Sequence, residues 1–265
     1  MKWLAYLVTA LFVLSLCVTL SLQIFNNTLL NSKFIEQKAD QTNTYSKISE
    51  GLNNELVKES GQINNPLVTA QLQQLITPAL IRQKVNSALD QLMAYYKNQG
   101  PPPEINLTAQ AQQLTALGVP VPPNSQLNKP IELSGSSKLK QLASSYETYK
   151  LASLIATIAL FVILVVLSVI RHKYKVLAVA PIIAGILLVP TGLTLLLFSP
   201  IANHFIKLHS TSNAFISASD SLVSAISKSI GKDFLFASVV LIVMGILAII
   251  ILSVLNKNQT KPRVA

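Results

Sequence analysis

Four long apolar runs constrain the fold of this chain more than any other feature of its sequence. They comprise residues 3–22, 151–170, 176–199 and 234–255, and none contains Asp, Glu, Lys, Arg or His. A helix needs about 20 apolar residues to cross the hydrocarbon core of a bilayer. A backbone in lipid must satisfy its own hydrogen bonds, and the alternating pattern of barrel strands is absent, so each run predicts a transmembrane helix.

The composition points to the same class of protein. Hydrophobic residues make up 51% of the 265 residues, and charged residues only 12%, which is about half the share of a soluble domain. These values argue against an ordinary soluble enzyme and a disordered chain. A disulfide scaffold is excluded as well, because Cys17 is the single cysteine. We therefore predict an all-α integral membrane protein with four transmembrane helices.

The apolar runs divide the chain into eight segments. We predict the transmembrane helices at residues 3–23, 151–170, 176–199 and 234–255. The other segments are a large loop of residues 24–150, a turn of residues 171–175, a second loop of residues 200–233 and a tail of residues 256–265. The first run also has the positive start of a signal peptide, but no small-x-small cleavage site follows it.

The distribution of charge predicts the orientation. With the N-terminus in the cytoplasm, the cytoplasmic segments carry seven basic residues and no acidic residue: Lys2, Arg171, Lys173, Lys175, Lys257, Lys261 and Arg263. The large loop is nearly balanced, with eleven basic and nine acidic residues. Basic residues favour the cytoplasmic side, so we predict that both termini of this cell (plasma) membrane protein are cytoplasmic. The net charge of +10 is then an orientation signal rather than a nucleic-acid surface.

Both loops have apolar residues at helical spacing. In the large loop we predict helical structure over residues 31–60, a helix that begins at Thr77-Pro78 and ends before Gly100, and a short helix from Thr108 that Gly118 closes. Residues 200–233 show the same periodicity, and neither loop has a period-2 strand pattern. We expect the membrane helices to continue outward and form a helical extracytoplasmic domain, held by apolar packing.

Prolines and glycines in the last two spans are candidates for kinks or close packing: Pro181, Gly185, Pro190, Gly192 and Gly245. A broken helix that lines a site is one interpretation of the third span. A kinked packing helix is favoured, because proline and glycine are common in membrane helices. We expect Gly245 to pack against Gly185 or Gly192.

Catalytic and metal-binding motifs are absent from the sequence. It contains no Gly-x-Ser-x-Gly, His-Glu-x-x-His, P-loop or Gly-x-Gly-x-x-Gly pattern. His172, His204 and His209 do not have the spacing of a zinc site on one helix. We predict no enzyme activity and no catalytic residue, cofactor or metal. The Asn-x-Thr motifs of the large loop begin at Asn26 and Asn106; both are expected by chance in so polar a loop and matter only in a eukaryotic host.

The order of loops and spans in this chain is similar to that of a known group of membrane proteins. The residues that support the similarity are the basic turn 171–175 and the glycines Gly192 and Gly245. The chain resembles uncharacterised bacterial four-span membrane proteins that have a large helical extracytoplasmic loop after the first span. This resemblance implies no activity. The layout also resembles the permease subunits of mechanotransmitting ABC transporters, whose cytoplasmic N-terminal segment is longer than Met1-Lys2.

These observations favour a non-enzymatic cell-envelope protein whose outside domain binds a partner protein or a surface component. Its expected partners are membrane lipid and a protein or a second copy of itself, and not nucleic acid. The alternative is a permease-like or accessory subunit of a transport complex, which a stoichiometric ATPase would support. A third interpretation is a membrane enzyme acting on lipid or cell wall, which would require acidic or histidine residues such as Asp90, Glu147 or His204.

Overall fold

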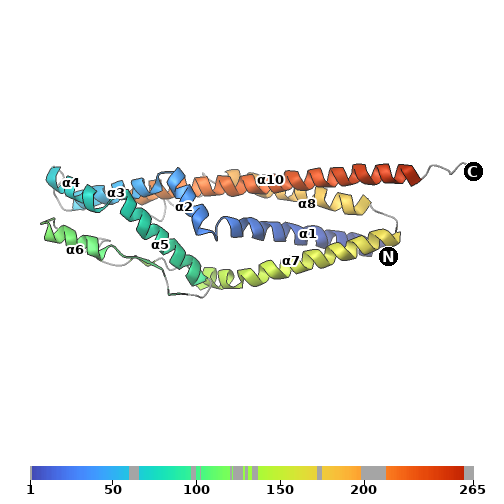
Figure 1. Ribbon diagram of the computed structural model, residues 1–265, viewed down its shortest axis with the longest axis horizontal. Coiled ribbons are helices and arrows are strands. Elements are labelled where there is room, and N and C mark those ends of the chain that lie inside the picture. The colour runs from blue at the N-terminus through green and yellow to red at the C-terminus, as the bar shows by residue number, and fades with distance from the viewer. Residues whose placement is uncertain are drawn as a thin grey trace, which may run out of the picture. The chain divides into compact units, whose positions relative to one another are not determined.

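The computed structural model describes residues 2–59, 66–96, 100–101, 103–119, 121, 128, 131–132, 137–171, 175–197 and 213–259. The described chain is almost entirely helical, as predicted, and four of its helices are long and apolar enough to cross a membrane (Figure 1). The protein is therefore a multi-pass membrane protein. Its helices that meet these criteria are α1 (Lys2–Asn27), α7 (Ser137–Arg171), α8 (Lys175–Leu197) and α10 (Asn213–Gln259).

The chain packs as two compact units. We call Met1–Asn27, Tyr146–Leu197 and Ser227–Ala265 the bundle unit, and Thr28–Ser145 and Phe198–Ile226 the loop unit. Helices α7 and α10 each contribute residues to both units. Each unit is described by itself below.

The bundle unit consists of four mutually packed helices. Contacts between α1 and α7 pair Phe12 with Phe161 and Leu22 with Tyr146, so these two helices run antiparallel. Helices α8 and α10 are antiparallel in the same way. Helix α1 meets α10 at Phe25 and Phe234 and again where Leu241 packs against the core around Phe12, so this pair is antiparallel too. Helices α1 and α8 therefore run in one direction, and α7 and α10 in the other.

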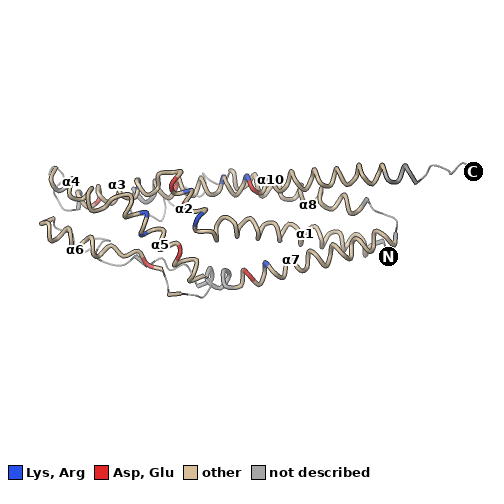
Figure 2. Tube along the Cα trace, viewed as in Figure 1, with Lys and Arg blue, Asp and Glu red and all other residues tan. Residues whose placement is uncertain are grey.

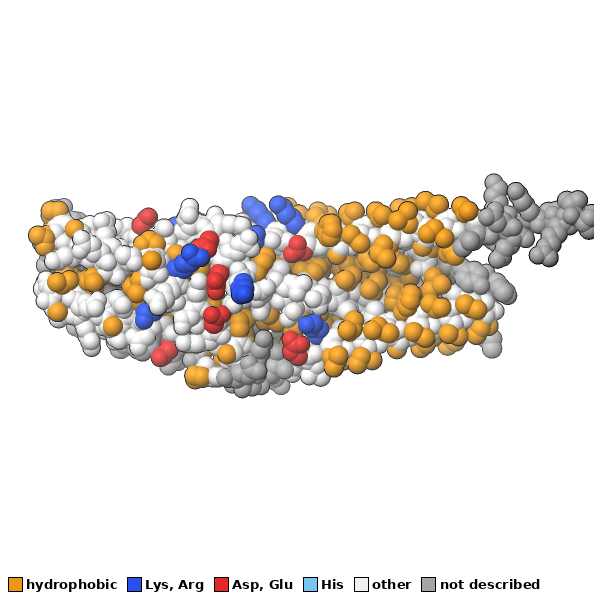
Figure 3. All heavy atoms as spheres, viewed as in Figure 1, with side chains coloured by type: hydrophobic (Ala, Val, Ile, Leu, Met, Phe, Trp, Pro, Cys, Tyr) orange, Lys and Arg blue, Asp and Glu red, His pale blue; other side chains and the backbone are white. Residues whose placement is uncertain are grey.

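Charged residues are absent from the central stretches of these four helices. Residues 3–27, 151–170, 176–197 and 234–254 contain no Lys, Arg, Asp or Glu, and they are tan in Figure 2. Hydrophobic side chains cover the visible surface of these stretches in Figure 3. Apolar groups exposed in this way are stable in contact with lipid rather than with water.

The length of α10 shows where its membrane crossing ends. At 1.5 Å per residue, its 47 residues extend about 70 Å, whereas the hydrocarbon core is about 30 Å thick. The charged residues Lys228, Lys232 and Asp233 precede the uncharged stretch that begins at Phe234. The part of α10 before Phe234 therefore extends beyond the hydrocarbon core, as does the part of α7 before Lys150.

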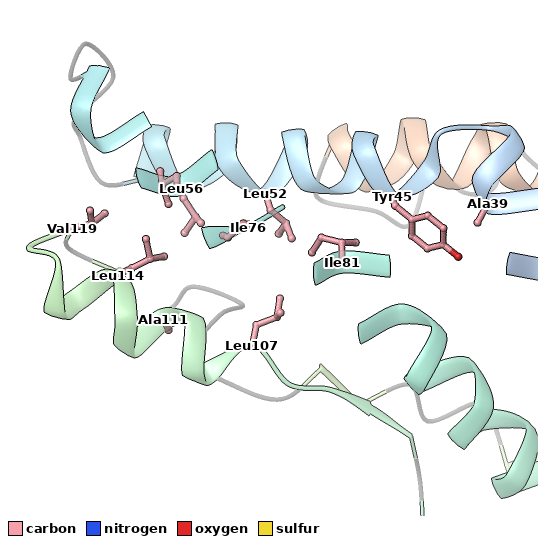
Figure 4. Packing of buried hydrophobic residues seen from close by; sticks show 11 residues of the cluster. Ala39, Tyr45, Leu52, Leu56, Ile76, Ile81, Leu107, Ala111, Leu114 and Val119 are labelled. Atoms are coloured by element: carbon pink, nitrogen blue, oxygen red, sulfur yellow. The ribbon is translucent and has the colours of Figure 1, made fainter. Parts of the chain in front are cut away.

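The loop unit has its own hydrophobic core. Its described helices are α2 (Ser32–Gln41), α3 (Thr44–Glu59), α4 (Pro66–Leu75), α5 (Pro78–Tyr96), α6 (Thr108–Ala116) and the starts of α7 and α10. Figure 4 shows side chains from α3, α6 and the α4–α5 connection pointing toward one another. Three of the most deeply buried are Leu72, Ile76 and Leu114, each at most 1% exposed. Burial of these apolar groups stabilises the unit without a disulfide.

The structure divides the predicted helical region 31–60 into two helices. Helix α2 ends at Gln41, and Asn43 adopts a positive φ of 52° before α3 begins at Thr44. Asparagine tolerates this left-handed conformation better than most residues. Asn31 starts α2 as its cap, since its side-chain oxygen accepts a hydrogen bond from the Phe34 amide at 3.4 Å.

The predicted ends of two later helices agree with the observed hydrogen bonds. Thr77 caps α5, because the Leu80 amide donates to Thr77 Oγ1 at 3.2 Å. Gly118, with φ of 77°, follows α6 and forms a Schellman motif. In this motif the Val119 amide donates to the Leu114 carbonyl and the Gly118 amide to the Thr115 carbonyl, both at 3.0 Å.

The prediction that the loops contain no strand is wrong in one place. Strand β1 (Glu104–Ile105) pairs antiparallel with β2 (Ile131–Glu132), with Ile105 opposite Ile131. Each strand has two residues, which is too short to show the alternation of apolar and polar residues on which strand prediction depends.

Candidate functional site

Small residues recur every seven positions along the facing sides of α8 and α10. They are Ala178, Gly185 and Gly192 on α8, and Gly231, Ser238 and Gly245 on α10. Because the helices are antiparallel, Gly192 lies against Gly231, Gly185 against Ser238, and Gly245 against Ala178. Small residues at such positions let two helix backbones approach closely within a membrane.

The distances at these positions leave no room for a side chain. A Cβ atom on Gly245 would lie 2.4 Å from Ile182 Cγ1 and 2.7 Å from the Ala178 carbonyl oxygen. A Cβ atom on Gly185 would lie 2.8 Å from the Ser238 carbonyl oxygen. Ser238, which is fully buried, also donates from Oγ to the Gly185 carbonyl oxygen at 2.6 Å. Packing and this hydrogen bond together hold α8 and α10 in one register.

The register differs from our expectation for Gly245. We expected Gly185 or Gly192 as its neighbour, but Ala178 and Ile182 occupy that place. The antiparallel arrangement brings the start of α8 to the later part of α10, so the glycines of α8 meet earlier residues of α10. Sequence reasoning did not single out Ala178, Gly231 or Ser238, although their seven-residue spacing is visible in the sequence.

Two prolines lie inside α8 without interrupting it. The helix continues from Lys175 to Leu197 through Pro181 and Pro190. Each proline lacks the amide that would bond to the carbonyl four residues earlier, which weakens the helix locally. Thr194 Oγ1 donates to the Pro190 carbonyl oxygen at 2.7 Å. This continuous helix fits a packing role better than a broken helix that lines a binding site.

Hydroxyl groups join α1 to α7 within the bundle. Thr157 Oγ1 lies 2.7 Å from Ser15 Oγ and 2.9 Å from Thr19 Oγ1. Thr157 Oγ1 can also donate to the Ser153 carbonyl oxygen at 2.8 Å, and Thr19 Oγ1 to the Ser15 carbonyl oxygen at 2.9 Å. Every hydroxyl in this cluster has a partner, so the cluster stabilises helix contact and offers no vacant ligand group.

An apolar core lies where all four helices meet. Phe12 and Val13 of α1 pack against Ala180 and Ala184 of α8, and Leu160 of α7 and Leu241 of α10 complete the contact. Cys17 lies beside this core, with Sγ 3.7 Å from the Ala184 carbonyl oxygen. These neighbours give the thiol a packing role, as expected for a small apolar side chain.

Aromatic and charged residues mark one edge of the apolar stretches. Tyr146 donates its hydroxyl to the Leu22 carbonyl oxygen, and Phe25 packs edge-on against Phe234 with ring centres 6.0 Å apart. Glu147 and Lys150 form an ion pair of 3.9 Å at the same level of α7. This is the arrangement expected of a membrane–water interface.

In the loop unit, two polar side chains of α3 bind the end of α4. Ser49 Oγ donates to the Ile76 carbonyl oxygen at 2.5 Å, and Asn53 Nδ2 donates to the same oxygen at 3.3 Å. The Asn53 side-chain oxygen is buried and accepts no hydrogen bond within the described residues. These contacts satisfy a carbonyl at the turn between α4 and α5, which is a structural role.

One lysine of the loop unit lies within hydrogen-bond distance of a serine, as a base lies beside a nucleophile in some enzymes. Lys47 Nζ donates to Ser221 Oγ at 3.0 Å, and both belong to the loop unit. The Ser221 hydroxyl in turn donates to the Ala218 carbonyl oxygen at 3.0 Å. The pair thus joins α3 to α10 by a side-chain hydrogen bond.

A second polar group of the loop unit surrounds Tyr45, which is 5% exposed. Its hydroxyl donates to Asn86 Oδ1 at 2.7 Å, and the Arg82 guanidinium lies over its ring while pairing with Asp40 at 2.7 Å. Burial, with the negative charges of Asp40 and Glu36, raises the pKa of Tyr45 to about 12, although Arg82 opposes the shift. Tyr45 is therefore neutral at physiological pH and joins α3 to α5.

Several predicted residues cannot be placed. Lys173, Lys261, Arg263 and the three histidines lie outside the described residues, as do the side chains of Lys2, Arg171, Lys175 and Lys257. Within the described part of the chain, no group of three or more His, Cys, Asp or Glu could hold a metal ion.

No protein-family model, curated protein or solved structure matches this chain. What the chain can do must therefore be argued from its own geometry. The bundle unit provides helix packing and a lipid-facing surface, and the loop unit provides a separately packed helical body.

Proposed function

We propose that this chain is a non-enzymatic cell-envelope membrane protein whose loop unit lies outside the cytoplasm and binds a partner protein or a surface component. The observation that carries the proposal is the structural difference between the two units. The loop unit has its own core of buried residues, whereas the bundle helices have uncharged central stretches. A separately packed unit attached to membrane helices without charged central residues favours binding of a partner over transport or catalysis.

The proposed orientation has both termini in the cytoplasm. Four crossings place the connection from α1 to α7 and the connection from α8 to α10 on one side of the bilayer, and these two connections contain the loop unit. The other side receives the seven basic residues and no acidic residue. The positive-inside rule assigns that basic side to the cytoplasm.

The bundle does not favour self-contained ion or proton transport. Ionisable side chains inside a membrane usually mark such pathways, and the central stretches of these helices carry none. The second candidate, an accessory or permease-like subunit, gains support from one observation. Helices α7 and α10 each continue from the loop unit into the bundle unit, so each could transmit a movement between them.

Brief cross-linking in native membranes, gentle-detergent purification and mass spectrometry would test the proposal. We expect a stoichiometric protein or surface component joined to exposed residues of the loop unit. A cytoplasmic ATPase recovered in stoichiometric amount would instead support the transport-subunit candidate. Cross-links confined to the bundle unit, with none from the loop unit, would contradict the binding role.

The orientation has a separate test with cysteine labelling. In a Cys17→Ala background, a cysteine at the exposed Gln112 of α6 should react with a membrane-impermeant reagent in intact cells. A cysteine at Asn258 should react only after the membrane is opened. The reverse pattern would place the loop unit in the cytoplasm and overturn the proposal.

A further inference from the structure

Two lysines of α10 lie beside the point where its uncharged stretch begins. Lys228 and Lys232 are exposed, belong to the bundle unit and precede Phe234 by six and two residues. At 1.5 Å per residue, they lie about 9 Å and 3 Å from Phe234 along the helix axis. Phospholipid headgroups occupy roughly 5–8 Å beyond each face of the hydrocarbon core. Both lysine side chains can therefore reach the headgroups.

The two lysines lie on one face of α10 without an acidic partner. Their spacing of four residues places the Cβ atoms about 5–6 Å apart, and like charges at this spacing destabilise a helix. Among the described residues, neither lysine forms an ion pair, whereas Lys150 at the same edge of the bundle pairs with Glu147 at 3.9 Å. A phosphate between Lys228 and Lys232 would offset their repulsion.

Asp233 follows Lys232 in the sequence but lies on another part of the helix surface. At about 100° per residue, it is about 100° from Lys232 and about 140° from Lys228 around the helix axis. Asp233 also has an interaction of its own. The face that carries the two lysines is therefore cationic.

Exposed apolar residues continue this face into the uncharged stretch. Phe236 is 72% exposed, and Val239, Val243 and Ile246 follow it at 57%, 47% and 46%. On an α-helix, these four residues and the two lysines fall within about 80° of one another around the axis. We call the four apolar residues the α10 stripe. Cationic groups followed by an apolar stripe match a phospholipid, in which an anionic headgroup is followed by acyl chains.

We propose that Lys228 and Lys232 bind the phosphate of one anionic phospholipid, whose acyl chain lies along the α10 stripe. Charge complementarity identifies the ligand as a lipid with net negative charge. A zwitterionic lipid carries a cationic group of its own, which two neighbouring ammonium groups repel. The site does not depend on which side of the membrane holds the loop unit, so it stands or fails separately from the proposed function.

Quenching of a single tryptophan by brominated phospholipids tests this site in vesicles that contain the full chain. Trp3 is the only tryptophan, so Trp3→Phe with Val239→Trp moves the fluorophore to the α10 stripe. In phosphatidylcholine vesicles, we expect brominated phosphatidylglycerol to reach half-maximal quenching at a mole fraction about fivefold lower than brominated phosphatidylcholine does. Equal quenching by the two brominated lipids would overturn the proposal.

Charge variants and a second tryptophan position locate the preference. Lys228→Gln combined with Lys232→Gln should remove the preference for phosphatidylglycerol. Quenching by brominated phosphatidylcholine should stay unchanged, which shows that α10 still lies in the bilayer. Lys150→Gln should retain the preference, because Lys150 already has an acidic partner. A tryptophan at the exposed Ile158 of α7 should be quenched equally by both lipids. A preference that survives the double variant, or one equally strong at Ile158, would contradict the site.

Inorganic phosphate distinguishes a lipid ligand from a free anion. Added at the ionic strength of a chloride control, it should leave the preference for phosphatidylglycerol unchanged, because contact of the acyl chain with the α10 stripe contributes to binding. Loss of the preference in phosphate but not in chloride would show that the two lysines bind free phosphate, and the lipid assignment would fail.

Discussion

At the scale of single residues, the packing of the bundle depends on glycines, which have no side chain. A glycine in a helix interior normally costs about 0.5–1 kcal/mol relative to alanine. At Gly185 and Gly245 that cost is offset, because the partner backbone comes closer than any Cβ atom would allow. The sign of a Gly→Ala substitution therefore reports whether two helix backbones are in contact.

We expect Gly245→Ala to destabilise the protein by about 1–3 kcal/mol, because the added methyl group overpacks the contact with Ala178 and Ile182. Thermal unfolding in detergent measures this change. Gly100→Ala is the control, since among the described residues a Cβ atom there meets only Ala94 Cβ, at 3.7 Å. Its midpoint should be unchanged or higher. An unchanged midpoint for Gly245→Ala would show that the backbones are not in contact.

Because the pKa of Tyr45 is raised in the folded protein, we expect the protein to lose stability in strong alkali. Its pKa in the folded protein is about 12, above the value of about 10 in an unfolded chain. The neutral phenol therefore stabilises the fold fully below pH about 10, and this contribution is lost as the pH rises toward 12. Denaturation should show a stability difference between wild type and Tyr45→Phe that is constant below pH about 10 and changes above it. A difference independent of pH would contradict this assignment.

At the scale of helices and strands, the ends of the elements are set by local hydrogen bonds. The cap at Thr77 and the Schellman motif at Gly118 both have sequence signals, and both could be predicted. The break at Asn43 was missed, although the five polar residues from Asp40 to Thr44 interrupt the apolar spacing there. Strands β1 and β2 were missed because their pairing is not local.

The C-terminal cap of α6 predicts the order of stability of three proteins: wild type, Gly118→Asn and Gly118→Ala. Because Gly118 has φ of 77°, Gly118→Ala should destabilise the loop unit by about 1–2 kcal/mol. Gly118→Asn should cost less, since asparagine tolerates this conformation. Limited proteolysis of the loop unit would rank the three proteins. An alanine variant as resistant as wild type would show that the turn adopts another conformation.

At the scale of the whole molecule, the sequence predicts the number of membrane helices well, because length and hydrophobicity determine it. It does not predict which small residue meets which, since that depends on helix direction and register. Ala178 opposite Gly245 is an example. The candidate site was likewise visible only in part: the glycines of α8 and α10 stand out in the sequence, whereas the hydrogen bond from Ser238 to the Gly185 carbonyl oxygen depends on the register of the folded helices.

Two separate cores predict two separate responses to mutation. Leu114 is fully buried in the loop unit, so Leu114→Ala should cost about 2–5 kcal/mol. Hydrogen exchange should then accelerate in α3, α4 and α6 and stay unchanged in α8. Leu117→Ala, at a leucine that is 50% exposed near the end of the same helix, is the control and should have little effect. Equal acceleration in α8 would show that the two units unfold as one.

The seven-residue spacing of small residues also limits how the bundle can move. If α8 slid along α10 by less than one repeat, about 10 Å, branched side chains such as Ile182 and Leu235 would meet the partner backbone. Sliding of this pair is therefore opposed by steric contact. Helix α1 faces α7 through hydroxyls on neighbouring turns, where Thr157 already has alternative partners. Small displacements can exchange those hydrogen bonds, so the α1–α7 contact tolerates sliding better than the α8–α10 contact does.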